Sequence, residues 1–355
     1  MARFSPVIKE DADFIVARMG DALEPLAGRT VLVTGAAGFL CSFLVDALCA
    51  ANERLSTPCH ILAMDNFAAS VPERLAHLAG RPDVTVLTHD VRQPFVWDGP
   101  IDYILHGASI ASPIYYRQFP LETIDANVTG TRLMLDLARE KGSRSVIVMS
   151  TSEIYGDPDP AHIPTPETYN GNVSCTGPRA CYDESKRLAE TIVQAYVQLY
   201  GTPVKVMRPF NVYGPGQRLN DARIIPDLMS AALTRKPLIL FSDGRATRSF
   251  CYVRDAIAGM LWVWLSDANG EAFNVGNDEE EISIRDLATR MAAVAGPPDL
   301  PVEFRVSADV KYTVDNPQRR RPILTKLRSL APWTPDVSLD EGLARTLRSY
   351  REQGL

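Results

Sequence analysis

The chain has 355 residues, of which 46% are hydrophobic and 23% are charged, and it carries a formal net charge of −6 at pH 7. This length and balance allow a large buried core, which excludes a disordered or fibrous chain, and the acidic charge argues against a nucleic-acid binder. No apolar run approaches the length of a membrane span, so we expect a globular protein of the cytoplasm with neither a nucleic-acid nor a membrane partner.

The first 28 residues precede the first predicted strand and form an N-terminal extension. Apolar side chains recur at roughly helical spacing between Asp11 and Leu26, at Phe14, Ile15, Met19 and Leu23. This spacing predicts a short helix packed on the body of the protein, with a partly disordered leader as the alternative.

The first predicted strand leads into a glycine-rich turn. The β-branched run Val31–Thr34 is followed by Gly35, Gly38 and an amphipathic stretch near residues 39–50, which predicts a strand, a phosphate loop and a helix. Gly35 permits the tight turn, and Gly38 lets the backbone approach a pyrophosphate whose charge is stabilised by the start of the helix. Cys41 stands at the usual third glycine, so a thiol must fit where the helix packs on the strand.

The second predicted strand, residues 60–64, ends at an acid, Asp65. This carboxylate is suited to accept hydrogen bonds from the two hydroxyls of an adenosine ribose, whereas a 2′-phosphate would meet like charge. Together with the glycine-rich turn, Asp65 predicts a dinucleotide site for NAD rather than NADP.

Strands and helices continue to alternate along the chain. Further strands are predicted over residues 84–88, 103–106, 145–149 and 204–207, and further helices near residues 120–141 and 182–200. The alternation predicts an α/β fold, a Rossmann-type doubly wound parallel sheet with helices on both faces. The expected domains are an NAD-binding domain over residues 29–212 with a return segment near 247–275, and a smaller C-terminal substrate-binding lobe over residues 213–246 and 276–355.

Cysteine and histidine spacing gives no sign of a metal site. The six cysteines show no C-x-x-C spacing, and the five histidines form no ligand pair. We therefore expect neither a bound metal nor a disulfide framework.

Three polar residues in the middle of the chain have the spacing of a redox site. Tyr182 and Lys186 lie one helical turn apart, and Thr151 follows a predicted strand. A tyrosine acts as a base near neutral pH only when its phenolate is stabilised, because its ordinary pKa is about 10. Lys186 can lower that pKa and bind a nicotinamide ribose, and the Thr151 hydroxyl can share the proton of a substrate alcohol. Because a Tyr-x-x-x-Lys pair alone is common, this hypothesis depends on the dinucleotide motif.

Six further stretches occur in a characteristic order: His106–Pro113, Ser150–Pro158, Gly177–Arg187, Arg208–Pro215, Thr247–Val253 and Asn316–Pro322. Over roughly residues 29–350 the chain thereby resembles the extended short-chain dehydrogenase/reductase family of nucleotide-sugar enzymes, and most closely its UDP-glucuronic acid decarboxylases. The resemblance implies tightly held NAD and a homodimer built from the two helices near residues 120–141 and 182–200. The apolar surface for that contact would come from Ile192, Val193, Tyr196 and Leu199.

The resemblance also implies roles for individual residues. NAD would be bound by Gly35, Gly38, Phe39, Leu40, Asp65, Asn66, Asp90, Val91, Tyr182 and Lys186. A UDP-linked uronic acid would be bound by Ser112, Ser152, Asn211, Arg223, Arg248 and Arg320. The catalytic residues would be Thr151, Glu153, Tyr182, Lys186 and Arg248. Several arginines suit an enclosed diphosphate, because a guanidinium pairs with phosphate through two hydrogen bonds.

The residue at position 152 separates the reactions of this family. Dehydratases carry an aspartate there, which protonates the departing C6 hydroxyl, whereas Ser152 is too weak an acid for that role. The sequence Thr151-Ser152-Glu153 is similar to that of the decarboxylases, in which NAD-dependent oxidation at C4 makes a β-keto acid that loses CO₂ readily. Glu153 and Arg248 would orient the acid group and manage the proton and the enolate charge, and the sequence does not assign the proton to one of them.

Other interpretations stay open. A UDP-hexuronate 4-epimerase would use the same Tyr182, Lys186 and NAD but keep the carboxylate, and a related enzyme could act on another nucleotide-linked uronic acid. A nucleotide-hexose 4,6-dehydratase is disfavoured by Ser152, and a non-catalytic NAD-binding regulator would be expected to have lost Tyr182 or Lys186. Cys41, Ile323 where an acid is frequent, and the N-terminal segment depart from the decarboxylase pattern.

Overall fold

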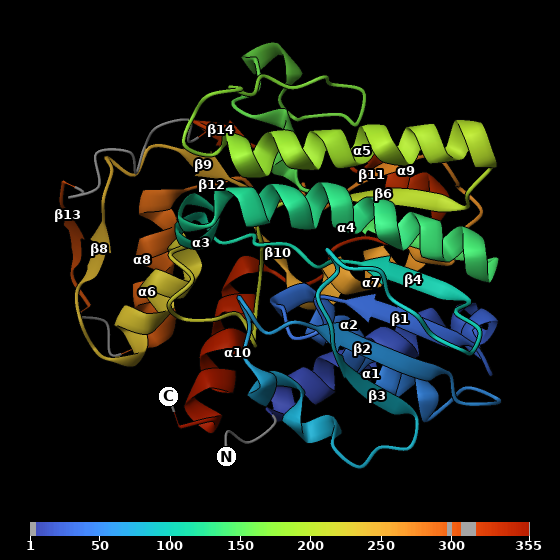
Figure 1. Cartoon of the computed structure of the whole chain (residues 1–355). Helices are drawn as coiled ribbons and strands as arrows, with labels where there is room; N and C mark the ends of the chain where they lie inside the picture. The colour runs from blue at the N-terminus through green and yellow to red at the C-terminus, as the bar shows by residue number, and fades with distance from the viewer. Residues whose placement is uncertain (1–4, 297–299, 307–316, 355) are drawn as a thin grey trace.

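A seven-stranded sheet forms the centre of the protein. The computed structural model describes residues 5–296, 300–306 and 317–354, so residues 1–4 and Asn316 of the sixth stretch lie outside the described residues. Neighbouring strands pair in parallel, in the order β11-β6-β5-β4-β1-β2-β3 (Figure 1). The strands are β1 Thr30–Thr34, β2 His60–Asp65, β3 Val84–Thr88, β4 Tyr103–His106, β5 Ser145–Met149, β6 Val204–Pro209 and β11 Ala272–Val275. The predicted Rossmann-type fold is confirmed.

The six predicted strands are all present, and their bounds differ from the predicted ones by at most two residues. Every residue of β1, β4 and β5 is buried, because helices cover both faces of a parallel sheet. The sequence did not indicate β11, which pairs with β6 and contains the buried Asn274. The Asn274 side chain accepts from the Tyr155 hydroxyl at 2.7 Å and donates to the Thr165 carbonyl at 3.0 Å.

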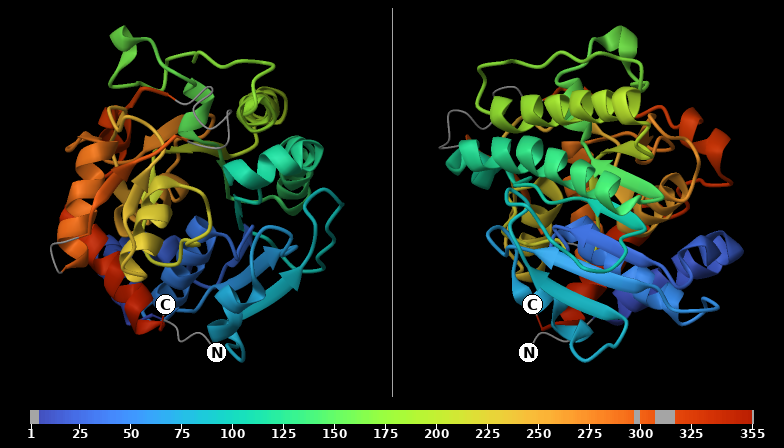
Figure 2. Two further views of the ribbon diagram at one scale, coloured as in Figure 1. Left: turned by 90° about the vertical axis from the view of Figure 1, so that its left-hand side faces the viewer. Right: turned by 45° about the vertical axis from the view of Figure 1, so that its right-hand side comes forward.

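Helices lie on both faces of the sheet. On one face α4 and α5 lie side by side, and on the other α2 and α7 cover the sheet (Figures 1 and 2). Their bounds are α2 Phe39–Asn52, α4 Pro120–Lys141, α5 Ala180–Tyr200 and α7 Val253–Trp264. Both α4 and α5 end at a glycine in the left-handed conformation, Gly142 and Gly201, where a side chain would be strained. Within the described part of the chain, no helix is long and apolar enough to cross a membrane.

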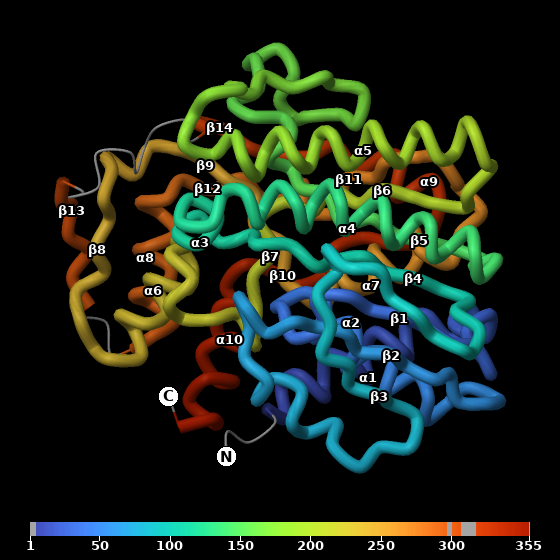
Figure 3. Tube along the Cα trace, viewed as in Figure 1, coloured from blue at the N-terminus to red at the C-terminus, as the bar shows by residue number. Residues whose placement is uncertain are grey.

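The remaining elements lie outside the seven-stranded sheet and its covering helices. Helices α6 and α8 and strands β8 and β13 lie together at one side of the molecule (Figure 3). The bounds are α6 Ile224–Leu233, β8 Leu238–Leu240, β9 Thr247–Arg248, β12 Ile282–Ser283, α8 Ile284–Ala295, β13 Val302–Phe304, β14 Arg319–Arg320, α9 Thr325–Leu330 and α10 Leu339–Glu352. The connecting elements are η2 Pro72–Leu78, α3 Pro113–Gln118, η3 Ser152–Tyr155, η4 Pro160–His162, β7 Val212–Tyr213 and β10 Cys251–Tyr252.

The N-terminal extension contains a helix that begins earlier than expected. Helix α1 spans Pro6–Met19, and the chain then continues as the 3₁₀-helix η1, Gly20–Leu26. The α-helix stops at Gly20, whose φ is 50°. Helix α1 packs against α2, α7 and α10, and its buried Asp11 accepts from the Tyr252 hydroxyl at 2.7 Å and from Arg345 at 2.6 Å. These contacts join the extension to helices from both ends of the chain.

One part of the predicted subunit surface is wrong. Val193 and Tyr196 are buried in a core cluster that includes residues of α4, and Ile192 is partly buried against the same cluster. Leu199, in contrast, is 71% exposed. Helix α5 packs against both the sheet and the neighbouring α4, so the apolar residues on these two sides belong to the core of the chain itself. The exposed apolar residues of α4 and α5 are Leu121, Ile124, Leu188, Leu199 and Tyr200.

Candidate active site

A cavity of about 1240 Å³ lies at the carboxyl ends of the strands. The residues directly after β1, β2, β4 and β5, namely Gly35, Asn66, Gly107 and Ser150, line it. Ligands of open parallel sheets bind at this edge, where the loops after the strands converge. Every residue that the sequence assigned to the site lines this cavity. Among the residues that the structure describes, no group of three or more His, Cys, Asp or Glu could hold a metal ion.

The loop between β1 and α2 leaves room for a pyrophosphate. Gly35 has a φ of 70°, and a Cβ there would lie 2.8 Å from the backbone of Ala108, so only glycine fits. Gly38 is the N-cap residue of α2. The first helical residues, Phe39 and Leu40, line the cavity, and the N–H groups of a first helical turn have no partner within the helix. The loop therefore fits the phosphates of NAD.

Cys41 fits in place of the third glycine because a neighbouring residue is itself a glycine. The Cys41 side chain is buried, and a Cβ at Gly107 would collide with its Sγ. Helix α2 can therefore still pack closely against the end of β4. The residue that lacks a side chain at this contact is Gly107, after β4, instead of the residue on α2. Burial raises the pKa of the Cys41 thiol to about 12, so the thiol is neutral at pH 7.

Asp65 is fixed at the end of β2. Its carboxylate accepts from the backbone N–H of Ala37 at 2.9 Å, from the backbone N–H of Phe67 at 2.8 Å and from Ser70 Oγ at 2.9 Å. Donors from two loops, the one after β1 and the one after β2, hold the carboxylate at the cavity wall beside Asn66. Asp90 and Val91 lie on the same wall.

We expect the protein to bind NAD at least about a hundredfold more tightly than NADP. The 2′-phosphate of NADP would bring negative charge against the fixed Asp65 carboxylate, and two like charges about 4 Å apart repel by a few kcal/mol near a protein surface. Equilibrium titration with both cofactors at one ionic strength measures the ratio. In Asp65→Ser the preference for NAD over NADP should become smaller. Tighter binding of NADP than of NAD by the unaltered protein would contradict the assignment of Asp65 to the adenosine ribose.

Tyr182 and Lys186 are buried on α5 at the cavity wall. Lys186 Nζ donates to the Met149 carbonyl at 2.7 Å and lies 5.9 Å from the centroid of the Tyr182 ring. Burial raises the pKa of Tyr182 to about 12, while the positive charge of Arg223 and a hydrogen bond with Thr151 act in the opposite direction. Burial also lowers the pKa of Lys186 to about 8. Arg223 is thus a further cation that favours the phenolate.

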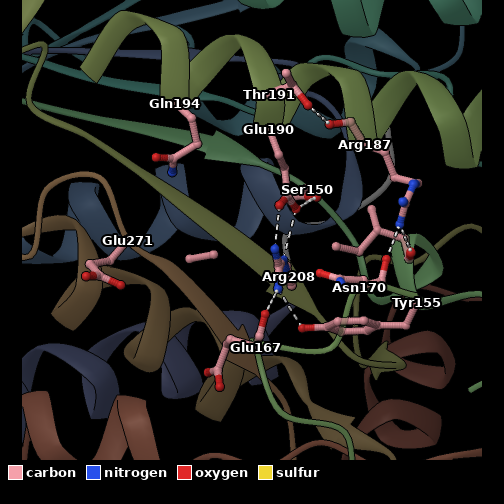
Figure 4. A network of polar contacts seen from close by, with 12 residues as sticks. Ser150, Tyr155, Glu167, Asn170, Arg187, Glu190, Thr191, Gln194, Arg208 and Glu271 are labelled. Atoms are coloured by element: carbon pink, nitrogen blue, oxygen red, sulfur yellow. Dashed lines mark hydrogen bonds and ion pairs between the residues drawn. The ribbon is translucent and has the colours of Figure 1, made fainter. Parts of the chain in front are cut away.

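The segment that carries Thr151 is tied to α5 by a polar network (Figure 4). Arg208 of β6 donates to the Glu190 carboxylate of α5 at 3.0 and 2.5 Å and to the Tyr155 hydroxyl at 2.8 Å. Ser150 Oγ donates to the same Glu190 carboxylate. The network holds both ends of residues 150–155, and so it fixes Thr151 relative to the helix that carries the tyrosine.

Glu153 is surrounded by guanidinium groups. Arg320 and Arg179 both donate to its carboxylate, and one bond from Arg320 measures 2.9 Å. Arg248 lies beside Arg320, because β9 and β14 pair with these two residues in register. Burial disfavours the charge on Glu153, but Arg179 and Arg320 hold the pKa of its carboxyl well below the usual range. Burial, followed by repulsion from Arg320, lowers the pKa of Arg248 to about 9.

Sequence reasoning missed Arg179. This residue lies in the Gly177–Arg187 stretch, three positions before Tyr182, and its position on the same helical turn was visible in the sequence. Its partner Glu153 lies 26 positions earlier on a different element, so the ion pair could be found only from the fold.

The predicted substrate residues contact neighbouring backbone. Ser112, Asn211 and Arg223 donate to the carbonyls of Asp221, Ser249 and Ala111, at 3.2, 3.2 and 2.9 Å respectively. Arg248 donates to the Pro317 and Thr247 carbonyls at 2.5 and 2.8 Å. These side chains line the cavity from several segments of the chain. Ser152 also lines the cavity and is buried.

The chain is similar to known proteins over most of its length. A model of the NAD dependent epimerase/dehydratase family matches residues 31–276. UDP-glucuronic acid decarboxylase 1 of Arabidopsis thaliana is 38% identical over 323 residues, which are 91% of this chain and 70% of that protein. UDP-glucuronic acid decarboxylase 1 of Xenopus tropicalis is 36% identical over 325 residues, which are 92% of this chain and 73% of that protein.

Solved structures share the fold. DesIV, a dTDP-glucose 4,6-dehydratase from Streptomyces venezuelae with NAD and TYD bound, has a TM-score of 0.78 and 25% identity, and the match covers 91% of this chain and 97% of that one. Epimerase Mth375 from Methanothermobacter thermautotrophicus has a TM-score of 0.82 and 24% identity, with 96% and 97% covered. The second likeness concerns the fold alone.

Proposed function

The chain belongs to the NAD-dependent epimerase/dehydratase family, and we propose that it converts UDP-glucuronic acid into UDP-xylose and CO₂ through a 4-keto intermediate. The observation that carries the proposal is the Glu153 carboxylate held among three arginines near Tyr182, a cationic wall that suits a sugar acid. Ser152, at the position of the dehydratase acid, is buried and is too weak an acid to protonate a departing hydroxyl. The proposed activity is the one named for the Arabidopsis and Xenopus relatives.

Tyr182 and its neighbours are assigned to the oxidation at C4 of the sugar. When bound, NAD supplies the oxidant for C4 and later the reductant that restores the alcohol, so no external electron donor is needed. The Tyr182 phenolate removes the proton of the C4 hydroxyl, and Thr151 shares that proton through its own hydroxyl. Lys186 and Arg223 stabilise the phenolate. Tyr182 returns the proton when the alcohol is formed again.

Glu153 and Arg248 are assigned to the loss of CO₂. The 4-ketone is β to the C6 carboxylate, so the C5–C6 bond breaks and its electron pair moves into an enolate over C4 and C5. Arg248 stabilises the enolate charge, and Glu153, which is paired with Arg320 beside Arg248, orients the acid group. A proton then adds at C5. The overall reaction consumes one proton and releases one CO₂.

We assign binding of the UDP moiety to Asn211, Arg223, Arg248 and Arg320, with Ser112 as a further substrate contact. Arg223 would exchange the Ala111 carbonyl for the diphosphate, because a hydrogen bond between two charged groups is stronger than one to a neutral carbonyl. Arg320 is already paired with Glu153, so it would serve the phosphate and the sugar end of the cavity at once.

Substrate labelled at C6 tests the proposed reaction directly. With purified protein and UDP-glucuronic acid that carries the label at C6, we expect the label in CO₂ and UDP-xylose as the product identified by NMR and mass. Recovery of all the label in a UDP-hexuronate would contradict the decarboxylase activity and favour the 4-epimerase activity. Turnover only with another nucleotide-linked uronic acid would move the substrate to that compound.

A homodimer formed through α4 and α5 is part of the proposal. The exposed apolar residues on these helices, among them Leu121, Leu188 and Leu199, support it. We also propose the cytoplasm as the compartment. All six cysteines are free thiols, which suits a reducing environment.

A further inference from the structure

Arg179 connects the two segments that carry the proposed chemistry. It is the N-cap residue of α5, the helix of Tyr182. Its guanidinium donates to Glu153 of η3, whose N-cap residue is Thr151. The Arg179 side chain is only 17% exposed, and its Nε lies 3.7 Å from the Asp183 carboxylate. One partly buried guanidinium therefore joins the helix of Tyr182 to residues 151–153.

Glu153 is held from two sides. Arg320 approaches it from β14 of the small three-stranded sheet, and Arg179 approaches it from the start of α5. A carboxylate without a cation becomes neutral when buried, because burial disfavours the charged form. Arg179 and Arg320 are the two paired charges that keep Glu153 ionised against burial, and Arg248 adds to their effect. Two anchors on different elements also fix the direction of the carboxylate, which one anchor alone would leave free to rotate.

We propose that Arg179 is a positioning residue of the reaction, which holds Glu153 as an anion and fixes it beside Tyr182 for the steps after oxidation at C4. The inference rests on the proposed function, because Glu153 has a role only in that chemistry. Arg179 acts on the substrate through Glu153, whereas Arg248 is assigned a direct contact.

The replacement Arg179→Gln is expected to lower kcat by about a hundredfold and to change KM for UDP-glucuronic acid much less. A small displacement of a catalytic group suffices for a loss of that size. Without one of the two arginines that pair with it, the partly buried Glu153 should have a higher pKa. Activity that needs the carboxylate is then lost as the pH falls through that higher pKa, so the acid limb of the kcat profile moves to higher pH. Arg179→Lys keeps the positive charge, so its kcat and the position of its acid limb should lie between those of Arg179→Gln and those of the unaltered protein.

The groups that face Glu153 are Arg179, Tyr182, Arg320, Arg248 and Tyr116. One other carboxyl belongs to this cluster, that of Asp183, which lies 3.7 Å from Arg179 Nε. The arginines and tyrosines all change charge well above pH 7. A shift of the acid limb that is absent in the Glu153→Gln background therefore reports on Glu153, whereas a shift that persists there reports on Asp183 and would contradict the proposal.

Combining Arg179→Gln with Glu153→Gln tests whether Arg179 acts through Glu153. In the Glu153→Gln background, the further loss from Arg179→Gln should be less than about threefold, because the partner of Arg179 is already gone. Losses in kcat that multiply in the double variant would contradict the proposal.

Arg254→Gln is a matched control for the loss of a buried arginine. The Arg254 side chain is 10% exposed, pairs with Asp336 at 2.7 Å and does not line the cavity. Its replacement should lower the thermal unfolding midpoint but leave the acid limb in place. An unshifted acid limb in Arg179→Gln, with a normal content of bound NAD, would overturn the inference. Failure of the proposed function looks different, since the unaltered protein would then release no CO₂ at any pH.

Discussion

Replacement of Tyr182 by Phe is expected to lower kcat by about 10²–10⁴-fold and to leave binding of NAD and UDP nearly unchanged. The substitution removes the hydroxyl that serves as the base in the proposed reaction. It keeps the ring, which stacks on Tyr116 with centroids 5.2 Å apart and planes 9° from parallel. Since the ring is buried at the cavity wall, its packing keeps the neighbouring side chains in place.

Two measurements test this prediction. Coupled product analysis gives kcat, and calorimetric titration gives the affinities for NAD and UDP. Tyr103→Phe is the matched control, because Tyr103 is also buried in the sheet and its hydroxyl donates only to the Pro25 carbonyl at 3.3 Å, away from the cavity. That variant should retain the kcat of the unaltered protein. Near-normal turnover by Tyr182→Phe on the true substrate would remove the tyrosine from the mechanism.

The fold could be predicted from local patterns because parallel strands covered on both faces are continuous apolar runs. The run at Val31–Thr34 is of this kind, and the strand there is buried throughout. Strand β11 escaped prediction because it is short and contains the polar Asn274. Its burial depends on hydrogen bonds to residues more than a hundred positions away, which no local pattern records.

The sequence of helix α5 alone does not reveal which of its apolar residues are exposed. Val193, Tyr196 and Leu199 are all apolar, and the sequence does not say which of them face the sheet. The packing of α4 and the sheet against α5 decides that Val193 and Tyr196 are core and that Leu199 is surface.

The site could be predicted where a motif carries its own geometry. The spacing of Tyr182 and Lys186 on one helix, and the glycine turn at Gly35, needed no knowledge of the fold. The pairing of Glu153 with Arg179 and Arg320 did need it, because β14 reaches Glu153 across 167 positions of sequence. A predicted phosphate arginine, Arg320, therefore has a second contact that its motif did not indicate.

The replacements Glu153→Gln and Arg248→Ala are expected to lower kcat by about 10²–10³-fold by slowing the steps after oxidation at C4. Arg248 lies beside Arg320 in the paired strands β9 and β14, where its charge is kept close to Glu153. An arginine beside the enolate stabilises charge that exists mainly after CO₂ has left, so its loss should act on turnover more than on affinity. Some weakening of substrate binding by Arg248→Ala is also expected, because the side chain is assigned a contact with the substrate.

Rapid mixing with UDP-glucuronic acid distinguishes these steps from oxidation. In both variants reduced NAD should accumulate on the enzyme and decay slowly, since oxidation at C4 still proceeds while loss of CO₂ is delayed. In Tyr182→Phe it should not accumulate, because the first step is blocked. Arg319→Ala is the control for Arg248→Ala, since Arg319 lies on the same small sheet but pairs with Glu281 at 2.6 Å and is half-exposed. Loss of turnover in Glu153→Gln without any accumulation of reduced NAD would place Glu153 in the oxidation step, and normal release of CO₂ by Arg248→Ala would remove that arginine from the chemistry.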